Sequence, residues 1–538
     1  MQAVSAVPTR PIRFWLNDEP VALDAVPPTR TVLEWLREER RLKGTKEGCA
    51  EGDCGACTVV VGESCPGGLR WRAIKGCITF VGALDGKQLV TVDELRGAGG
   101  SLHPVQQALV DAHGSQCGFC TPGFVMSLYA LYQDKRQRGE RAVSRSEAAD
   151  ALSGNLCRCT GYRPIVDAAC AMTAGPWVAP DEAAVAQRLA ALAQDPPLAH
   201  ASAAGEFHAP RSLAELVALR ARLPQARLVA GATDVGLWVT KQFRRLGEIV
   251  HLGAVAELQR IEERDGQLVI GAGATLEAAW AALAARWPSL HELWLRFAGR
   301  PTREAGTMGG NLANGSPIGD SAPVLMALGA TLVLQQGERV RRVALDAFYT
   351  GYMKSQREPG EFVRAIELPL WRAGAPFDRL RAIGDSSSVQ TEGVSGRAQT
   401  PSVRAEPVEA SVRRDLFAYK ISKRFDCDIS AVCVGIAITR DAAGTVTAAR
   451  LAFGGMAATV ARAKTAEAAL IGRPFDTAAA DAAAQALAAD FTPMSDLRAS
   501  AAYRLQVAGN LIRRAALEAA AGAPVSVWDR GISATEAA

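Results

Sequence analysis

Residues 47–57 read Glu-Gly-Cys-Ala-Glu-Gly-Asp-Cys-Gly-Ala-Cys and bring three cysteines, Cys49, Cys54 and Cys57, into one short loop. A fourth cysteine, Cys77, follows on the next expected element. The Cys-x4-Cys-x2-Cys spacing is that of plant-type [2Fe–2S] proteins. Three thiolates then converge from one tight loop and the fourth arrives from a neighbouring segment. The stretch therefore predicts a small ferredoxin-like unit that holds an iron–sulfur cluster.

Two other interpretations of these cysteines are weaker. A redox dithiol at Cys54 and Cys57 would not require Cys49 and Cys77, and a zinc ribbon would need a second Cys-x2-Cys near Cys77, which the sequence lacks. Small residues within the loop let the backbone wrap closely and point its N–H groups at the sulfurs. These glycines are Gly48, Gly52 and Gly55.

A second group of cysteines consists of Cys117-Gly-Phe-Cys120 and Cys157-Arg-Cys159. A Cys-x-Cys pair is unusual for zinc, but it suits thiolates that meet one iron or two adjacent irons. Each half lies beside an expected helix start, at Thr121-Pro122 and at residues 160–164, and a helix N-terminus stabilises negative charge. By its spacing alone this group leaves zinc open. The first group beside it favours a second [2Fe–2S] cluster.

Composition is that of a large globular protein. The chain has 538 residues, of which 49% are hydrophobic and 22% charged, and a formal net charge of +4. That length predicts two to four domains, and the weak charge points to neither nucleic acid nor an anionic membrane. Residues 1–14 lack the apolar core of a secretion signal, and the longest uncharged stretch, residues 116–133, is broken by Pro and Gly. We expect a cytoplasmic location and no membrane segment.

Cysteine usage agrees with that location. Nine of the twelve cysteines precede residue 160, and in a reducing compartment clustered cysteines are more often metal ligands than disulfides. Cys433 lies in a strand-like stretch and is expected to be a small buried hydrophobe. The six histidines are scattered, so no His-based metal centre or catalytic triad is predicted.

The pattern along the chain predicts several units. Residues 12–16 and 21–23 form an expected hairpin, strands are expected at 228–230, 268–270, 332–334 and 432–438, and helices at 458–470 and 498–517. The predicted divisions are a ferredoxin-like domain at 11–92, a helical domain at 98–172, a linker at 173–207, an FAD-binding domain at 208–383, a disordered insertion at 384–413, and the C-terminal part of the flavoprotein domain at 414–525.

Three stretches, residues 47–57, 116–123 and 154–164, closely resemble the xanthine dehydrogenase/aldehyde oxidase (molybdenum hydroxylase) family. The resemblance implies an α+β multidomain protein: a ferredoxin-like β-grasp [2Fe–2S] domain, a helical-bundle [2Fe–2S] domain and an α+β FAD-binding domain of the molybdenum-hydroxylase flavoprotein type. All eight cluster ligands of the family are present, as Cys49, Cys54, Cys57, Cys77, Cys117, Cys120, Cys157 and Cys159.

The second half resembles the FAD domain of the same family. Residues 228–235 match the loop that wraps the pyrophosphate of the flavin, and residues 297–299 and 306–320 match the second FAD-binding stretch. The FAD contacts implied by position are Leu228, Val229, Ala230, Gly231, Ala232, Thr233, Asp234, Val235, Phe297, Thr307, Gly309, Gly310, Asn311, Asp320, Val363 and Lys420.

The residues themselves allow a partial account of this site. Gly231, Gly309 and Gly310 are expected to expose backbone N–H groups to phosphate oxygens, and Asp320 to accept from a ribose hydroxyl. No G-x-G-x-x-G is present, which disfavours a Rossmann site. Glycine-rich turns alone do not specify FAD. No side chain is a convincing acid, base or nucleophile, and Lys420 is the candidate for tuning the flavin.

Single-chain family members continue into a molybdopterin domain, whereas this sequence ends at Ala538. The resemblance therefore implies the small subunit of a bacterial xanthine dehydrogenase, in a heterotetramer of two small and two molybdopterin-binding large subunits. Electrons from the molybdenum centre of the partner, which oxidises hypoxanthine and xanthine to urate, would pass through both clusters to FAD and then to NAD⁺. The alternatives are another molybdenum hydroxylase acting on an aldehyde or N-heterocycle, a free-standing iron–sulfur flavoprotein reductase, and a structural zinc protein.

Overall fold

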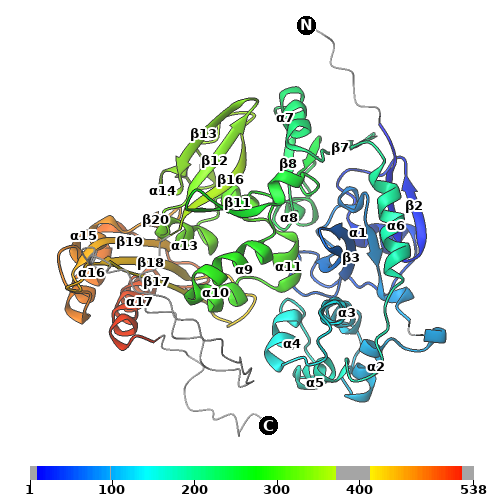
Figure 1. Cartoon of the computed structure of the whole chain (residues 1–538), viewed down its shortest axis with the longest axis horizontal. Coiled ribbons are helices and arrows are strands. Elements are labelled where there is room, and N and C mark those ends of the chain that lie inside the picture. The colour runs from blue at the N-terminus through cyan, green and yellow to red at the C-terminus, as the bar shows by residue number, and fades with distance from the viewer. Residues whose placement is uncertain (1–8, 97, 371–411, 524–538) are drawn as a thin grey trace, which may run out of the picture.

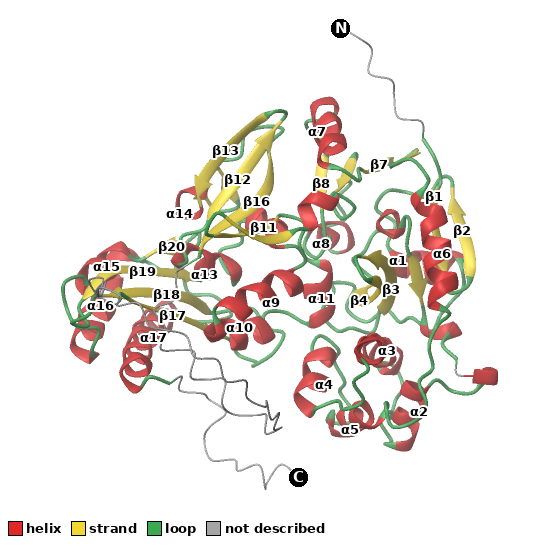
Figure 2. Cartoon of the chain, viewed as in Figure 1, coloured by secondary structure: helices red, strands yellow, loops and turns green. Residues whose placement is uncertain are grey.

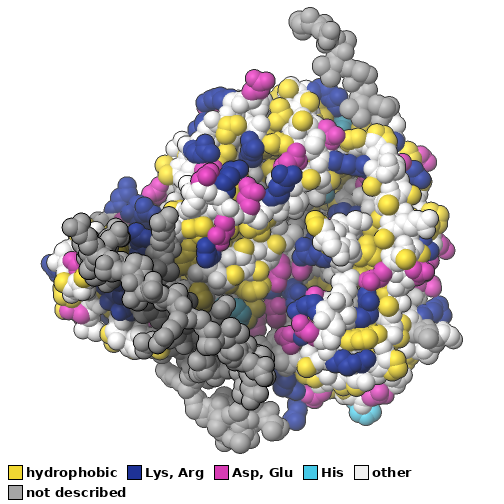
Figure 3. All heavy atoms as spheres, in the orientation of Figure 1, with side chains coloured by type: hydrophobic (Ala, Val, Ile, Leu, Met, Phe, Trp, Pro, Cys, Tyr) yellow, Lys and Arg dark blue, Asp and Glu magenta, His cyan; other side chains and the backbone are white. Residues whose placement is uncertain are grey.

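The structure is a computed structural model that describes residues 9–96, 98–370 and 412–523. The two iron–sulfur units lie side by side at one end of the molecule, and the chain then continues through a central sheet-and-helix region to a C-terminal sheet covered by helices (Figures 1 and 2). On the face drawn in Figure 3, Lys and Arg are interspersed with Asp and Glu. None of the helices described is both long and apolar enough to traverse a bilayer.

The first unit is a five-stranded sheet in the order β2-β1-β5-β3-β4. Alternate residues of β1 face the core, and Phe14 packs edge-on against Trp35 with ring centroids 5.2 Å apart. Thr31 and Glu34 form a reciprocal capping box at the start of α1. The predicted hairpin is confirmed. The elements are β1 (Ile12–Leu16), β2 (Glu19–Leu23), α1 (Val32–Glu34, continued by a π-helical turn at Trp35–Glu39), β3 (Thr58–Cys65), β4 (Gly68–Lys75) and β5 (Gln88–Val90).

The second unit is a four-helix bundle, as predicted. Helix α3 (Thr121–Arg138) forms the core of this unit and is buried along most of its length. The N-cap of α3 is Cys120, one residue before the expected helix start at Thr121. Pro122 follows inside the first turn, where its missing N–H costs nothing. The helices are α2 (Pro104–Asp111), α3 (Thr121–Arg138), α4 (Arg145–Leu152) and α5 (Arg163–Ala171).

The predicted linker at 173–207 is wrong for most of its length. The segment contains helix α6 (Glu182–Ala193) and strand β6 (Leu198–Ser202), and it runs into strand β7 (Gly205–Ala209). Helix α6 packs on strands β3 and β4 of the ferredoxin-like unit. Its residues Val185, Leu189 and Leu192 are buried at helical spacing among alanines, in the hydrophobic core that this unit shares with the helical unit. This apolar stripe stabilises a helix where the Ala- and Pro-rich composition indicated a connector.

Strands β6 and β7 begin the flavoprotein part. Its first sheet has the order β6-β7-β9-β8, in which β9 pairs in parallel with both β7 and β8. A short turn joins the end of β8 to α8. The elements are α7 (Leu213–Arg222), β8 (Arg227–Val229), α8 (Val235–Thr240) and β9 (Ile249–His251).

A second five-stranded sheet, in the order β10-β11-β16-β12-β13, carries one face of the largest hydrophobic core. The strands predicted at 228–230, 268–270 and 332–334 are confirmed as β8, β11 and β12. The remaining elements are β10 (Ile261–Arg264), β11 (Gln267–Gly271), α9 (Leu276–Arg286), α10 (His291–Arg296), α11 (Arg300–Ala305), α12 (Met308–Asn314), α13 (Ser321–Ala327), β12 (Thr331–Gln336), β13 (Arg339–Ala344), α14 (Leu345–Phe348), β14 (Tyr349–Gly351), β15 (Lys354–Ser355) and β16 (Phe362–Pro369).

The C-terminal sheet has the order β17-β18-β19-β20 and is covered by helices. Cys433 in β18 is fully buried, as predicted. The helix predicted at 458–470 begins only at Lys464, because Ala461 and Arg462 pair with β19 instead. The predicted insertion at 384–413 lies outside the described residues except for its last two, of which Arg413 begins β17. The elements are β17 (Arg413–Ile421), β18 (Val432–Arg440), β19 (Val446–Gly454), β20 (Ala461–Arg462), α15 (Lys464–Leu470), α16 (Thr477–Asp490) and α17 (Ala501–Ala521).

Candidate iron–sulfur and flavin sites

The four cysteines of the first group converge in the structure. Cys49 is hydrogen-bonded through its thiol to both Cys54 and Cys77, and Cys57 is hydrogen-bonded to Cys77. The backbone N–H of Cys54 also donates to the Cys49 sulfur at 3.3 Å. The loop that carries them needs glycine, since Gly52 has a φ of +78°.

The thiols of this group share protons. Hydrogen bonding with Cys54 and Cys77 lowers the pKa of Cys49, and hydrogen bonding with Cys49 together with burial raises the pKa of Cys54. Hydrogen bonds from Cys49 and Cys57 likewise raise the pKa of Cys77. Four sulfurs this close compete for protons, and iron binding would deprotonate all of them.

The second group converges from two loops. Cys117 is hydrogen-bonded to Cys159, and Cys120 to Cys157. Burial, followed by hydrogen bonding to Cys157, raises the pKa of Cys120 to about 12. The backbone N–H of Thr160 donates to the Cys157 sulfur at 3.4 Å, and the Thr160 hydroxyl lies 3.2 Å from it. These bonds offset the effect of burial and lower the pKa of Cys157.

The pairing of thiols fits [2Fe–2S] clusters, in which each of two irons takes two cysteine thiolates. In the first group Cys49 contacts Cys54 and Cys77, and Cys77 also contacts Cys57; in the second group Cys117 contacts Cys159, and Cys120 contacts Cys157. Within the described residues, no set of three or more His, Cys, Asp or Glu side chains is arranged around a single metal ion.

The two cysteine groups are in direct contact through the backbone. The N–H of Leu156, which precedes Cys157, donates to the carbonyl oxygen of Cys54 at 2.9 Å. The side chain of Asn155 donates to the carbonyl oxygen of Gly55 at 3.2 Å. The backbone path from Cys54 to Cys157 therefore crosses one hydrogen bond and one intervening residue, Leu156.

The predicted flavin residues do not all lie together. A cavity between the ferredoxin-like unit and the flavoprotein part is lined by residues 229–232 and Thr307, together with Arg72, Lys87 and His251. Asn311, Asp320, Val363 and Lys420 do not line it. Sequence reasoning missed Arg72, Lys87 and His251, because they come from distant segments and no spacing connects them to the loop.

The turn between β8 and α8 fits a pyrophosphate. In the described part of the chain, no acceptor is hydrogen-bonded to the backbone N–H groups of residues 231–234. Ala232 holds a positive φ of +56°, which turns successive N–H groups in this segment. Residues that would hold the phosphates are thus present in the predicted loop.

The prediction that Gly309 and Gly310 offer free N–H groups is wrong. The N–H of Gly309 donates to the Ala272 carbonyl at 3.0 Å, and that of Gly310 donates to the Thr307 hydroxyl at 3.1 Å. Gly309 is small for a packing reason instead, since a Cβ there would lie 2.4 Å from the Cβ of Ala272. Thr307 acts as the N-cap of α12.

Farther along, Asn311 has a buried side-chain oxygen without a hydrogen-bond partner in the described structure. Such an orphaned acceptor fits a ligand hydroxyl or N–H. Asp320 is engaged within the protein: it forms an ion pair with Lys420 at 2.7 Å and accepts from the Ser430 hydroxyl at 2.5 Å. The roles predicted for Asp320 and Lys420 toward the flavin remain predictions.

Phe297 and Val363 lie in the large hydrophobic core of the flavoprotein part. Val363 in β16 pairs with Leu334 across the sheet, and Phe297 packs 6.0 Å from Trp280, centroid to centroid. Their contact with FAD remains a prediction.

The first cysteine group also touches the flavoprotein part. Leu237 of α8 packs against the cluster formed by Cys57, Cys77 and Ile78. Lys241, which follows α8, donates to the Cys49 carbonyl at 2.5 Å. The helix that follows the candidate pyrophosphate loop therefore lies directly on the ligands of the first group.

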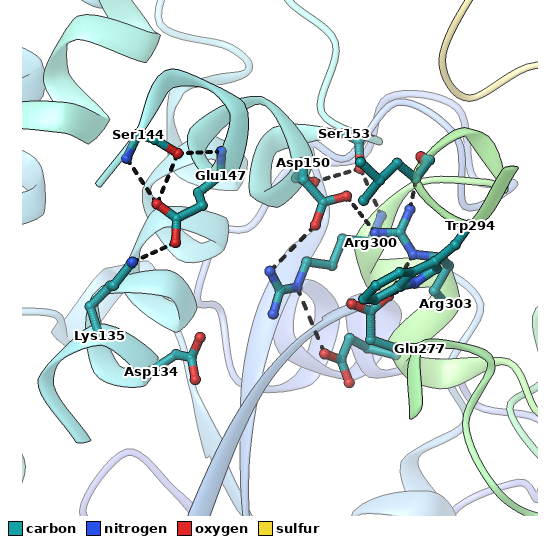
Figure 4. A network of polar contacts seen from close by, with 12 residues as sticks. Asp134, Lys135, Ser144, Glu147, Asp150, Ser153, Glu277, Trp294, Arg300 and Arg303 are labelled. Atoms are coloured by element: carbon teal, nitrogen blue, oxygen red, sulfur yellow. Dashed lines mark hydrogen bonds and ion pairs between the residues drawn. The ribbon is translucent and has the colours of Figure 1, made fainter. Parts of the chain in front are cut away.

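A buried ion-pair network joins the units (Figure 4). Arg303 of α11, with a fully buried side chain, donates to Asp150 of the helical unit and to Glu277 of α9, both at 2.6 Å. Next to it, Glu304 pairs with Arg70 of the ferredoxin-like unit at 2.7 Å. Carboxylates and guanidinium groups from all three parts thus meet where the parts meet.

Comparison with protein-family models covers the chain in the same order as its structural units. Residues 14–80 match the 2Fe-2S iron-sulfur cluster binding domain, and residues 91–170 match the [2Fe-2S] binding domain. Residues 202–371 match the FAD binding domain in molybdopterin dehydrogenase, and residues 417–519 match the CO dehydrogenase flavoprotein C-terminal domain. The chain belongs to the molybdenum hydroxylase family. It contains the two [2Fe–2S]-binding domains and the FAD-binding domain of that family.

Curated relatives in this family include the xanthine dehydrogenases of Emericella nidulans, 32% identical over 89% of this chain, and of Drosophila subobscura, 31% identical over 94%. The chain spans only 36% and 39% of the length of these relatives. Solved structures with some similarity are CO dehydrogenase from Oligotropha carboxidovorans (28% identity, TM-score 0.49) and quinoline 2-oxidoreductase from Pseudomonas putida 86 (25%, 0.47). Each match covers 59% of this chain and 97% of the solved chain.

Proposed function

We propose that this molybdenum hydroxylase chain is the electron-transfer subunit of a xanthine dehydrogenase. It would take electrons from a molybdenum centre on a partner subunit, where hypoxanthine and xanthine are oxidised to urate, and deliver them to NAD⁺. When bound, the clusters carry single electrons and FAD exchanges one or two, which lets a hydride reach NAD⁺. The relatives named xanthine dehydrogenase, aligned over up to 95% of the chain, support this choice of substrate.

The observation that carries the electron-transfer role is the unbroken contact from one site to the next. The second cysteine group is joined to the first by the bond from Leu156 to Cys54, and the first group packs against α8 beside the flavin loop. Because these contacts use ligand residues and their immediate neighbours, they hold the three sites in a fixed order.

The second cysteine group lies at the exposed end of this series of sites, which supports binding of the partner subunit there. Cys117 and Cys159 are exposed. Phe119, between two of the ligands, is 49% exposed, and Tyr162, close to Cys159, is 39% exposed. Large apolar side chains around an exposed redox site are typical of an interface. We place the molybdenum-containing subunit there, in an assembly of two small and two large subunits.

The test is purification from the natural host of the tagged chain with its associated polypeptides, followed by metal, flavin and activity assays. We expect co-purification of a molybdenum-containing subunit and xanthine-dependent reduction of NAD⁺. Activity on an aldehyde or N-heterocycle in place of xanthine would assign the chain to another molybdenum hydroxylase. A chain that purifies alone with full NADH–dye activity would instead be a free-standing reductase.

A further inference from the structure

Lys75 is a buried cation at the boundary between the two iron–sulfur units. It ends strand β4, two residues before Cys77, and Lys75 as a whole is only 1% exposed. Its ammonium group donates to the carbonyl oxygen of Gly154 in the helical unit at 2.5 Å. The charge is thus held in a solvent-free contact between the cysteine groups.

The other strongly buried lysines of the described chain have carboxylate partners. Lys135 pairs with Glu140 at 2.9 Å and with Glu147 at 2.5 Å, and Lys420 pairs with Asp320 at 2.7 Å. Lys75 forms no ion pair with any carboxylate in the part of the chain that the structure describes. A buried ammonium without a counter-charge is costly, so another anion is expected close by.

The first cysteine group supplies that anion. The strand partner of Lys75 is Thr58, directly after Cys57, and the N–H of Gly76 donates to the Cys57 carbonyl at 3.1 Å. Lys75 also lies two residues before Cys77, so one ligand of the group precedes its strand partner and another follows it along the chain. The ammonium therefore acts on a cluster ligand through a poorly screened region.

We propose that Lys75 is the cation that compensates the charge of the first cluster and raises its reduction potential. Reduction adds negative charge to four thiolates and two irons, and a fixed buried cation stabilises the more negative state more strongly. The proposal rests on the proposed electron-transfer function of this chain and identifies a residue that sets the direction of transfer toward the first cluster.

The test is a redox titration of the purified holoprotein, followed by electron paramagnetic resonance. Lys75→Gln removes the charge but keeps a donor for the Gly154 carbonyl, and Lys75→Arg keeps the charge. We expect Lys75→Gln to disfavour reduction of the first cluster about tenfold, which is ~59 mV for one electron, and Lys75→Arg to shift it far less. The matched control is Lys46→Gln, because Lys46 lies three residues before Cys49 but its exposed ammonium only reaches the Lys43 carbonyl, at 3.0 Å.

Three results would overturn the proposal. They are unchanged midpoints of both clusters in Lys75→Gln, a shift confined to the second cluster, and loss of first-cluster iron in Lys75→Gln but not in Lys75→Arg, which would assign Lys75 to assembly. Failure of the proposed function is separate, since it would show in the wild-type chain as the absence of two cluster signals or of xanthine-dependent NAD⁺ reduction.

Discussion

The guanidinium of Arg303 and the carboxylate of Asp150 lie 2.6 Å apart across the boundary between the flavoprotein part and the helical iron–sulfur unit. Arg303 also donates to the carbonyl oxygens of Leu295, Phe297 and Ala298, at 3.2 to 3.3 Å. All three nitrogen atoms of this buried guanidinium thus donate hydrogen bonds, to acceptors in the flavoprotein part and in the helical unit. The pair fixes the position of α4, and with it the loop to Cys157, relative to α11.

Replacing one member of this pair should destabilise the protein more than removing both. Arg303→Met leaves Asp150 and Glu277 without their partner, at a cost of about 3–5 kcal/mol. Arg303→Met/Asp150→Asn should recover part of that loss. Urea unfolding followed by tryptophan fluorescence measures the difference. Arg286→Met, which breaks a surface pair with Glu263, is the control and should change stability far less.

The two iron–sulfur clusters should be lost independently of each other. Cys57→Ser should abolish one dithionite-induced spin signal and Cys159→Ser the other, with iron falling from about four to about two atoms per chain in each case. Iron analysis and electron paramagnetic resonance of the purified variants check this. Cys65→Ser, at an exposed thiol outside both groups, should keep both signals. Loss of both signals in either ligand variant would contradict two separate clusters.

The contact between the cysteine groups leaves no room for a methyl group at Gly123. A Cβ there would lie 2.1 Å from the carbonyl oxygen of Gly55. Gly123→Ala should therefore force the loops apart, cost about 1–3 kcal/mol, and weaken the magnetic coupling between the clusters at low temperature. Gly175→Ala is the control, because no atom lies within 4 Å of its Cβ position. Equal stability and coupling in both variants would refute the close approach.

Residue patterns predicted the cysteine groups and the strands β1, β2, β8, β11, β12 and β18 because those features are local. The ligands of the first group come from one loop and from the turn that follows the next hairpin, and β11 and β12 carry continuous apolar runs. Contacts between segments that are distant in the sequence produce no local residue pattern. The acceptor for Gly309 N–H is Ala272, and the partner of Arg303 is 153 residues away at Asp150. Helix α6 was missed because only three large apolar side chains mark its buried face.

Lys420 and Asp320 should depend on each other. Lys420→Met leaves a buried carboxylate unpaired and should cost about 3–5 kcal/mol, whereas Lys420→Met/Asp320→Asn should cost less. If Lys420 also tunes the flavin, both variants should slow turnover with NAD⁺ more than they slow cluster reduction. Denaturation midpoints test the first statement, and stopped-flow absorbance tests the second. Unchanged NAD⁺ turnover in the double variant, with FAD fully bound, would rule out the tuning role.

His251 should make the flavin region sensitive to acid. It lies at the end of β9, lines the candidate flavin cavity and stacks on Phe207 with ring centroids 5.6 Å apart. Burial, followed by the positive charge of Lys87, lowers its pKa from 6.5 to about 3. Between those two values the unfolded chain binds a proton that the folded chain does not, so stability falls as the pH drops through this range.

The expected loss from this one group between pH 8 and pH 5 is about 2 kcal/mol. His251→Gln should lower stability at pH 8 but flatten the decline toward pH 5 by that amount. Urea midpoints at the two pH values measure the change. His113→Gln, at an exposed histidine, is the control and should keep the wild-type decline. A His251→Gln variant that loses stability toward pH 5 as steeply as the wild type would show that this imidazole already carries its proton in the folded chain.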